Sequence, residues 1–246
     1  MFQKPPPKAS ELHNKPSEDF AAKLAQTTAL LKQAALEFSP CVQASSLGAE
    51  DMVITTLIRQ HDLAINVFVL DTGALHTETL ALLERVQSRA SARSQVLVYK
   101  PLLEEVIAFI RRDGQDAMYK SQTLRKECCQ IRKLEPLARA LNGQKAWITG
   151  LRGEQSNNRA NMKWIEEDTQ AGMSIKKFNP LMQWTWGDVW HFLSEHSVDY
   201  NPLHDQFYPS IGCAPCTRAI SLGEDFRAGR WWWEDASAKE CGLHQK

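Results

Sequence analysis

The sequence predicts an α/β fold in which a parallel sheet is covered by helices on both faces. Short, largely apolar segments at 41–46, 65–70, 95–99 and 145–149 are typical of strands that are buried on both faces. Stretches with helical spacing of apolar residues separate these segments, and this alternation indicates crossover helices. A chain of 246 residues is long enough for one such domain.

The helices are expected between these strands. The predicted ranges are 18–38, about 50–60, about 76–90, around 102–112 and 131–141. Ser17 followed by two acidic residues marks the start of the first helix, and Pro40 ends it. Gly143 closes the last one, which Pro136 should kink or begin.

The chain is expected to have three parts. Residues 1–16 hold four of the eleven prolines and suggest a flexible leader. Residues 17–235 form the α/β domain, and its portion after about 180 is expected to be a loop-rich C-terminal extension that holds six of the eight tryptophans. Residues 236–246 form a mobile tail.

Composition excludes several classes of protein. Lysine plus arginine and aspartate plus glutamate each total 29, so the chain lacks the basic excess of proteins that coat nucleic acids or anionic membranes. No apolar stretch reaches the roughly 18 residues that span a bilayer. The first residues lack the apolar core of a signal peptide. We therefore expect a cytoplasmic protein with no nucleic-acid or membrane partner.

Four of the six cysteines form two close pairs, Cys128 with Cys129 and Cys213 with Cys216. In a reducing compartment they are not expected to form structural disulfides. Two converging pairs can make a four-thiolate site for zinc or for an iron–sulfur cluster, although adjacent cysteines are unusual zinc ligands. Two alternatives remain open: Cys213-Ala-Pro-Cys216 has the form of a redox motif, and all four could be core thiols.

Residues Ser45-Ser-Leu-Gly-Ala-Glu-Asp51 join a predicted strand to a predicted helix. Gly48 permits a tight turn there, and the serine hydroxyls and free amides of a helix start attract anions. The segment matches neither the Walker pattern nor the dinucleotide fingerprint. Cationic side chains elsewhere indicate a pocket for more than one anionic group: Lys133, Arg152, Arg159, Arg227 and Arg230.

Cys241 lies in the terminal segment Glu240-Cys-Gly-Leu-His244. A cysteine on a mobile tail can act as a swinging nucleophile if its thiolate is stabilised on arrival, and Lys239 and His244 could supply that stabilisation. The alternative is an incidental exposed thiol.

Taken together, ordered segments over nearly all of 41–246 resemble the assimilatory phosphosulfate reductases, specifically the iron–sulfur-containing adenylylsulfate reductases. The matching segments include Ser45–Asp51, Leu70-Asp-Thr-Gly73, Lys126-Glu-Cys-Cys129, Trp147-Ile-Thr-Gly-Leu-Arg152, Asn179-Pro-Leu181, Tyr200-Asn-Pro-Leu-His204, Gly212-Cys-Ala-Pro-Cys-Thr217, Gly223-Glu-Asp-Phe-Arg-Ala-Gly-Arg230 and Glu240–His244.

The resemblance implies a Rossmann-like parallel sheet of the adenine-nucleotide α-hydrolase type. It implies that Cys128, Cys129, Cys213 and Cys216 bind one [4Fe-4S] cluster. It also implies that Cys241 attacks adenosine 5′-phosphosulfate, releases AMP and carries an S-sulfo group until thioredoxin or a similar dithiol frees sulfite. The implied substrate-binding residues are Ser45, Ser46, Gly48, Glu50, Asp51, Lys133, Arg152, Arg159, Arg227, Arg230 and His244. Family members often form homo-oligomers.

Rival functions remain. Reductases of 3′-phosphoadenylylsulfate usually keep the terminal cysteine but lack the two cysteine pairs, so the pairs favour the substrate without the 3′-phosphate, without excluding a dual-specificity enzyme. ATP-dependent ligases and tRNA thiolases share the 45–51 loop, but the tail Glu240–His244 is unexpected in them. A zinc-stabilised binding module is the non-enzymatic alternative.

Overall fold

A computed structural model describes residues 7–155, 162–170, 173–221 and 223–234. Its centre is a six-stranded sheet with the strand order β3-β2-β1-β4-β6-β5. Neighbouring strands are parallel except β5, which pairs antiparallel with β6. The strands are β1 Cys41–Ser45, β2 Asn66–Leu70, β3 Val96–Tyr99, β4 Ala146–Ile148, β5 Ile165–Gln170 and β6 Met173–Phe178.

The four predicted strands are confirmed, and the α/β, Rossmann-like class is correct. The sheet is parallel, as predicted, except at one edge, where β6 and β5 form a hairpin whose outer strand runs antiparallel. This hairpin was not predicted because its strands are polar: Glu166 and Glu167 on β5 stand opposite Lys177 and Lys176 on β6. Cross-strand charge pairs at a sheet edge stabilise pairing without an apolar run.

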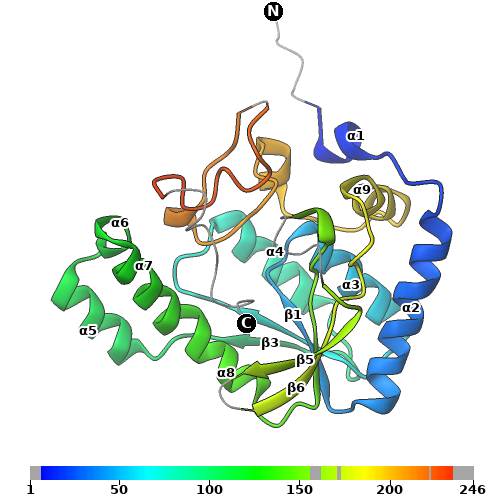
Figure 1. The fold of residues 1–246 in the computed structure, drawn as a ribbon, viewed down its shortest axis with the longest axis horizontal. Helices are drawn as coiled ribbons and strands as arrows, with labels where there is room; N and C mark the ends of the chain where they lie inside the picture. Colours follow the sequence, from blue (N-terminus) through cyan, green and yellow to red (C-terminus); the bar gives the residue numbers. More distant parts are fainter. Residues whose placement is uncertain (1–6, 156–161, 171–172, 222, 235–246) are drawn as a thin grey trace, which may run out of the picture.

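Helices cover both faces of the sheet (Figure 1). Alternate residues of β1 show the two faces, since Cys41 packs into one buried cluster with α2, α3, α4 and α9, and Val42 packs into a second with α8. The helices are α1 Ala9–His13, α2 Phe20–Glu37, α3 Ala49–Gln60, α4 Thr77–Ser88, α5 Leu103–Asp113, α6 Ala117–Lys120, α7 Gln122–Cys129, α8 Glu135–Leu141 and α9 Trp186–Glu195. None of these described helices is both long and apolar enough to cross a membrane.

The helix predicted over 131–141 begins earlier and contains a wider turn. Helix α7 continues into a π-helical turn over Gln130–Leu134 and then into α8. Pro136 lacks an N–H donor, so a regular ladder cannot continue through it. The N–H of Glu135 instead donates to the carbonyl of Gln130, five residues earlier. Pro136 therefore stands at the start of α8, after a π turn that the sequence pattern did not reveal.

Residues 7–16, which were expected to belong to a flexible leader, contain the short helix α1. Helix α1 packs on α9, and the backbone N–H of Ala9 donates to Asp205 Oδ1 at 2.7 Å. Just after it, the N–H and hydroxyl of Ser17 both donate to Asp188 Oδ1 at 2.7 Å. Asp188 also accepts from Lys23 Nζ at 3.2 Å, so one buried carboxylate ties α2 and α9 together.

The C-terminal extension is less loop-rich than expected, because it contains α9. Thr185 and Asp188 form a reciprocal capping box at the start of this helix. The remainder agrees with the expectation of an irregular segment, with short 3₁₀ turns at Pro202–Gln206 and Ala214–Cys216. Helix α9 was not predicted because tryptophans and a histidine obscure its apolar spacing.

Thr27 joins α2 to the segment that precedes α9. Its hydroxyl donates to the carbonyl of Pro180 at 2.7 Å and accepts from Trp184 Nε1 at 2.9 Å. We expect Thr27→Val to lower the free energy of unfolding by about 2–3 kcal/mol, because two buried polar groups lose their partner. Thr28→Val, one residue away, should change it by less than about 0.5 kcal/mol, because the Thr28 hydroxyl only bonds the carbonyl of Leu24 within its own helix. Equal losses in urea unfolding of the two variants would contradict this.

Candidate functional site

A cavity of about 230 Å³ lies where the carboxyl ends of β1, β2 and β4 meet. This edge of a parallel sheet is the usual ligand site of open α/β folds. Its walls come from the β1–α3 loop, the end of β4, the π turn, the loop over 209–213 and the segment over 226–230. The cavity therefore gathers segments from most of the described chain.

The β1–α3 loop forms one wall with Ser45, Ser46 and Gly48. The sequence assigned the tight turn to Gly48, but this is wrong: Gly48 has an ordinary φ of −70°, and the residue with positive φ is the buried Leu47, at 61°. Gly48 serves a different purpose, because a Cβ there would lie 3.3 Å from Ser46 Oγ. The missing side chain leaves the start of α3 open to the cavity.

Asp51 holds this loop in shape. Its Oδ2 accepts hydrogen bonds from the backbone N–H and the hydroxyl of Ser46, at 2.6 and 2.7 Å. The backbone of Gly150, at the end of β4, also hydrogen-bonds to it, and a Cβ on Gly150 would lie 2.3 Å from Asp51 Oδ1. Burial raises the pKa of the carboxyl to about 6, although the hydrogen bonds from Ser46 oppose the shift. Asp51 lines the cavity, but its hydrogen bonds go to the protein.

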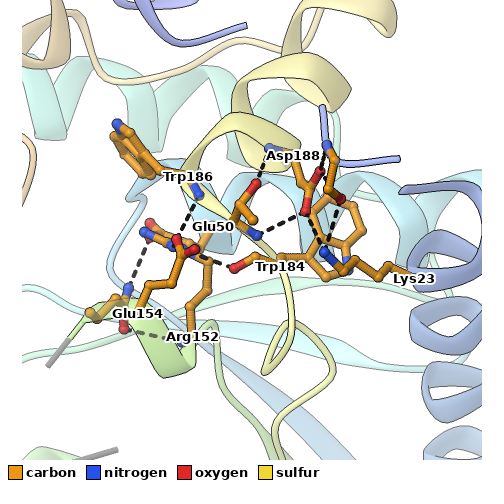
Figure 2. A network of polar contacts seen from close by, with 10 residues as sticks. Lys23, Glu50, Arg152, Glu154, Trp184, Trp186 and Asp188 are labelled. Carbon is orange, nitrogen blue, oxygen red and sulfur yellow. Dashed lines mark hydrogen bonds and ion pairs between the residues drawn. The ribbon is translucent and has the colours of Figure 1, made fainter. Parts of the chain in front are cut away.

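Glu50 and Arg152 form a buried ion pair beside the cavity (Figure 2). Arg152 Nε lies 2.9 Å from Glu50 Oε1, which also accepts from Gln155 Nε2 at 2.8 Å. The Arg152 guanidinium further contacts Glu154 and lies over the ring of Trp186, 5.1 Å from its centroid. Arg152 is 1% exposed and is not among the residues that line the cavity. In the structure Arg152 fixes Glu50 and the segment that follows β4, and its contact with an anionic ligand stays a prediction.

Three of the predicted cationic residues line the cavity: Lys133, Arg227 and Arg230. Lys133 comes from the π turn, directly after the first cysteine pair. The Arg230 guanidinium lies over the ring of Trp231, at 4.7 Å from its centroid, and packs so closely on Gly212 that a Cβ there would be 2.5 Å from Nη2. The predicted site residues Arg159, Cys241 and His244 lie outside the described residues.

The four paired cysteines are buried, and none of them forms a disulfide. Cys128 and Cys129 end α7; Cys213 precedes the 3₁₀ turn Ala214–Cys216 and lines the cavity, and Cys216 is the last residue of that turn. Burial raises the pKa of both Cys128 and Cys216, and a cysteine of the other pair adds to each shift, Cys213 for Cys128 and Cys129 for Cys216. Within the described residues, no three or more His, Cys, Asp or Glu side chains form a group that could hold a metal ion.

The groups around Cys213 favour the thiolate form of this cysteine. The Thr72 hydroxyl lies 3.2 Å from Cys213 Sγ, and this hydroxyl together with Lys133, Arg230 and Arg132 lowers the pKa of Cys213 against the effect of burial. Burial raises the pKa of Cys216 to about 12. Trp231 packs in a cluster with Cys213 and Cys216, and its buried Nε1 has no partner among the described atoms. Sequence analysis did not assign Thr72 and Trp231 to the site, because only the fold shows that both are buried beside the cysteine sulfurs.

The fold and the cavity together define an α/β protein with a partly cationic cavity beside buried thiols at the carboxyl edge of its sheet. The comparison with protein families narrows this class. The chain belongs to the phosphoadenosine phosphosulfate reductase domain family, whose model matches residues 40–219.

Similar curated proteins carry one name, adenosine 5′-phosphosulfate reductase. The protein from Allochromatium vinosum is 52% identical over 217 residues, which are 88% of this chain and 83% of that protein. The one from Neisseria meningitidis serogroup A is 50% identical over 82% of each chain. The one from Burkholderia cepacia is 48% identical over 92% of this chain and 89% of that protein.

Solved structures support the fold assignment. A phosphoadenylyl-sulfate reductase from Candida auris, in a phosphate complex, superposes with a TM-score of 0.65 at 25% identity, covering 84% of this chain and 98% of that one. An FMN adenylyltransferase from Candida glabrata superposes with a TM-score of 0.55 at 13% identity, covering 94% and 80%, and shares the fold alone.

Asp51 should give the stability a defined pH dependence. Its pKa rises from the ordinary 3.8 to about 6 in the folded chain, so its contribution to stability is full below about pH 4 and is lost as the pH rises through about 6. Between about pH 5 and about pH 8, the free energy of unfolding should therefore fall by about 1 kcal/mol more in the native protein than in Asp51→Asn.

Urea unfolding at several pH values checks this. Asp62→Asn is the control, because the Asp62 side chain is 69% exposed and should leave the pH profile of the native protein in place. Parallel profiles for the native protein and Asp51→Asn would contradict the shifted pKa.

Proposed function

We propose that this chain reduces adenosine 5′-phosphosulfate to sulfite and AMP through a covalent intermediate on Cys241, in the assimilation of sulfate. One observation carries the proposal: the β1–α3 loop faces Lys133, Arg227 and Arg230 across a cavity that Cys213 also lines. Relatives at 48–52% identity that are named for this activity support the same substrate.

The proposed reduction proceeds in two steps, transfer of the sulfo group to Cys241 and its release as sulfite. The Cys241 thiolate attacks the sulfur of the phosphosulfate, a sulfur–sulfur bond forms, and the bond from sulfur to the bridging oxygen breaks. AMP leaves with that electron pair. A dithiol donor, thioredoxin or a similar protein, then attacks Cys241 Sγ and expels sulfite. Its second thiol closes a disulfide on the donor, so the donor supplies both electrons.

Lys133, Arg227 and Arg230, which we call the cationic wall of the cavity, reduce the electrostatic repulsion that opposes the first step. A thiolate that approaches an anionic phosphosulfate is repelled, and fixed positive groups offset that repulsion most strongly where the site excludes water. Lys133, Arg227 and Arg230 line the cavity from two separate segments and can neutralise charge on both sides of the bond that breaks. Neutralisation of charge by the protein is therefore the main contribution that we assign to these residues.

We also propose that Cys128, Cys129, Cys213 and Cys216 hold one [4Fe-4S] cluster. The chemistry of the donor set fits this group, because all four thiols are buried soft ligands, the Thr72 hydroxyl can donate to Cys213, and the buried Trp231 Nε1 is a further donor in the cluster that contains Cys213 and Cys216. When bound, the cluster would supply a fixed electrostatic centre, and its oxidation state would not change during turnover. Lys133, four residues after Cys129, would lie between this centre and the substrate.

Exposed apolar residues and the cysteines support three further proposals, on assembly, compartment and substrate. Exposed apolar side chains gather near edge strand β3 and the start of α5, and they support assembly into a homo-oligomer: Leu97, Leu102, Leu103 and Ile107. A reducing compartment, the cytoplasm, suits five free cysteines among the described residues. The two cysteine pairs favour the substrate without a 3′-phosphate, and faster turnover of the 3′-phosphorylated nucleotide would reverse this preference.

Cys241 provides the test of the mechanism. With excess dithiol and substrate, Cys241→Ser should release no sulfite above background and form no S-sulfo enzyme in mass spectra, while keeping the brown colour of a bound cluster. Cys41→Ala should keep full activity, because the Cys41 thiol is buried in β1 and burial raises its pKa to about 11. Undiminished sulfite release by Cys241→Ser would refute the mechanism, and a colourless native protein would refute the cluster.

Arg227 tests the role of the cationic wall. Arg227→Gln should lower kcat by roughly 10²–10³-fold, the usual effect of removing one group that stabilises charge in a transition state. Arg218→Gln is the matched control, since Arg218 follows the second cysteine pair but forms a partly exposed ion pair with Glu224 and does not line the cavity. Steady-state sulfite assays on both variants make the comparison, and equal rates would count against this role.

A further inference from the structure

His204 is a buried histidine that lines the cavity, and its ring nitrogens make no hydrogen bond of ordinary geometry to the residues that the structure describes. It lies in the 3₁₀ turn Pro202–Gln206 and is 7% exposed. Both of its ring nitrogens are buried, and neither makes a hydrogen bond of ordinary geometry to a described atom, although the backbone of Tyr208 lies close enough to one of them to raise the pKa of the ring against the effect of burial. Buried polar groups of folded proteins nearly always have a partner, because leaving one unpaired costs free energy. An unpaired imidazole in a ligand cavity therefore indicates that the ligand supplies the partner.

Two tryptophan rings and the hydrogen bonds of Asn201 hold the His204 ring in place. It packs edge-on against Trp190 and Trp186, with ring centroids 5.4 and 5.9 Å apart. The turn that carries it begins at the fully buried Asn201, whose side chain accepts from the N–H of Leu203 and donates to Thr79 Oγ1 at 2.8 Å. The position of the imidazole is thus fixed before any ligand binds.

The charges around His204 differ from those at the cationic wall. The charged groups that act most strongly on its ring are Glu50, Asp205 and His13, whereas Lys133 and Arg230 act on Cys213. Burial lowers the pKa of His204 to about 4, so the ring is neutral at physiological pH and has one donor and one acceptor. A neutral ring near a carboxylate is a poor partner for a phosphate and a good partner for a hydroxyl group.

We propose that His204 binds a ribose hydroxyl of the nucleotide and thereby fixes the nucleoside while its anionic end meets Lys133, Arg227 and Arg230. The proposal rests on the proposed function for the identity of the ligand. A hydroxyl both donates and accepts, as the neutral imidazole does, and one such bond to an uncharged group contributes about threefold to tenfold in affinity. His204 then determines how the nucleotide is oriented rather than how its sulfur reacts.

The test is a double-mutant cycle in which a protein side chain and a ligand hydroxyl are removed separately and together, with affinities measured by calorimetry on the full chain. The ligands are AMP, 2′-deoxy-AMP and 3′-deoxy-AMP, and inosine monophosphate serves as a change in the base. The variant His204→Phe keeps the aromatic packing on Trp186 and Trp190 and removes both nitrogens. The native protein should bind one deoxynucleotide about tenfold more weakly than AMP. His204→Phe should bind AMP about tenfold more weakly and show no further loss with that deoxynucleotide.

His76→Phe is the matched control. The His76 ring also packs edge-on against an aromatic ring, that of Tyr208, and its Nε2 is buried without a partner, but it does not line the cavity. This variant should discriminate between AMP and the deoxynucleotides as the native protein does. If His204→Phe does not fold, His204→Asn, which keeps a donor and an acceptor, should retain part of the discrimination.

Three results would overturn the assignment. The first is an equal loss with the deoxynucleotides in the native protein and in the folded His204 variant. The second is a uniform weakening of all ligands, which means that the ring only packs. The third is a coupling to inosine monophosphate alone, which means that His204 contacts the base. Failure of the native protein to bind AMP would overturn the nucleotide site and this assignment together, whereas sulfite release by Cys241→Ser with the His204 coupling intact would overturn only the chemistry.

Discussion

The carboxyl group of Asp51 is the constraint on which the site depends. It binds the amide and hydroxyl of Ser46 and the backbone of Gly150, so it joins the loop after β1 to the end of the adjacent strand β4. Two strands that are parallel neighbours in the sheet thereby share one rigid edge. The burial of this carboxyl has a free-energy cost, which indicates that the shape of the edge matters more than local stability.

The sequence predicted those parts of the fold that depend on apolar patterning. The strands near 41–46, 65–70, 95–99 and 145–149 are continuous apolar runs, and burial on both faces of a sheet requires such runs. The β5–β6 hairpin was missed because its pairing depends on opposed charges, which resemble any polar loop in the sequence. The π turn before Pro136 was missed because periodicity shows that a helix exists but not how its hydrogen bonds are arranged.

The candidate site was predicted as a set of residues rather than as an arrangement. Ser45, Lys133 and Arg230 do meet at one cavity, since the ends of parallel strands lie at one edge. The pairing of Arg152 with Glu50 was not predicted, because a positive charge after a strand can face a ligand or a buried carboxylate, and the sequence alone does not show which. His204 received no role because burial without a partner cannot be read from one sequence.

The π turn has a consequence for how this chain can change in evolution. A regular α-helix advances by about 100° per residue, so one extra residue in a turn re-aims everything beyond it. Cys128 and Cys129 lie before the widened turn, and Leu137 and Leu141, which pack against the sheet, lie after it. Losing a single residue here would rotate the cysteines relative to the leucines by about 100°, so that the two sets of side chains could not both reach their present positions. The π turn therefore allows one helical segment to place cysteines at the site and leucines against the sheet.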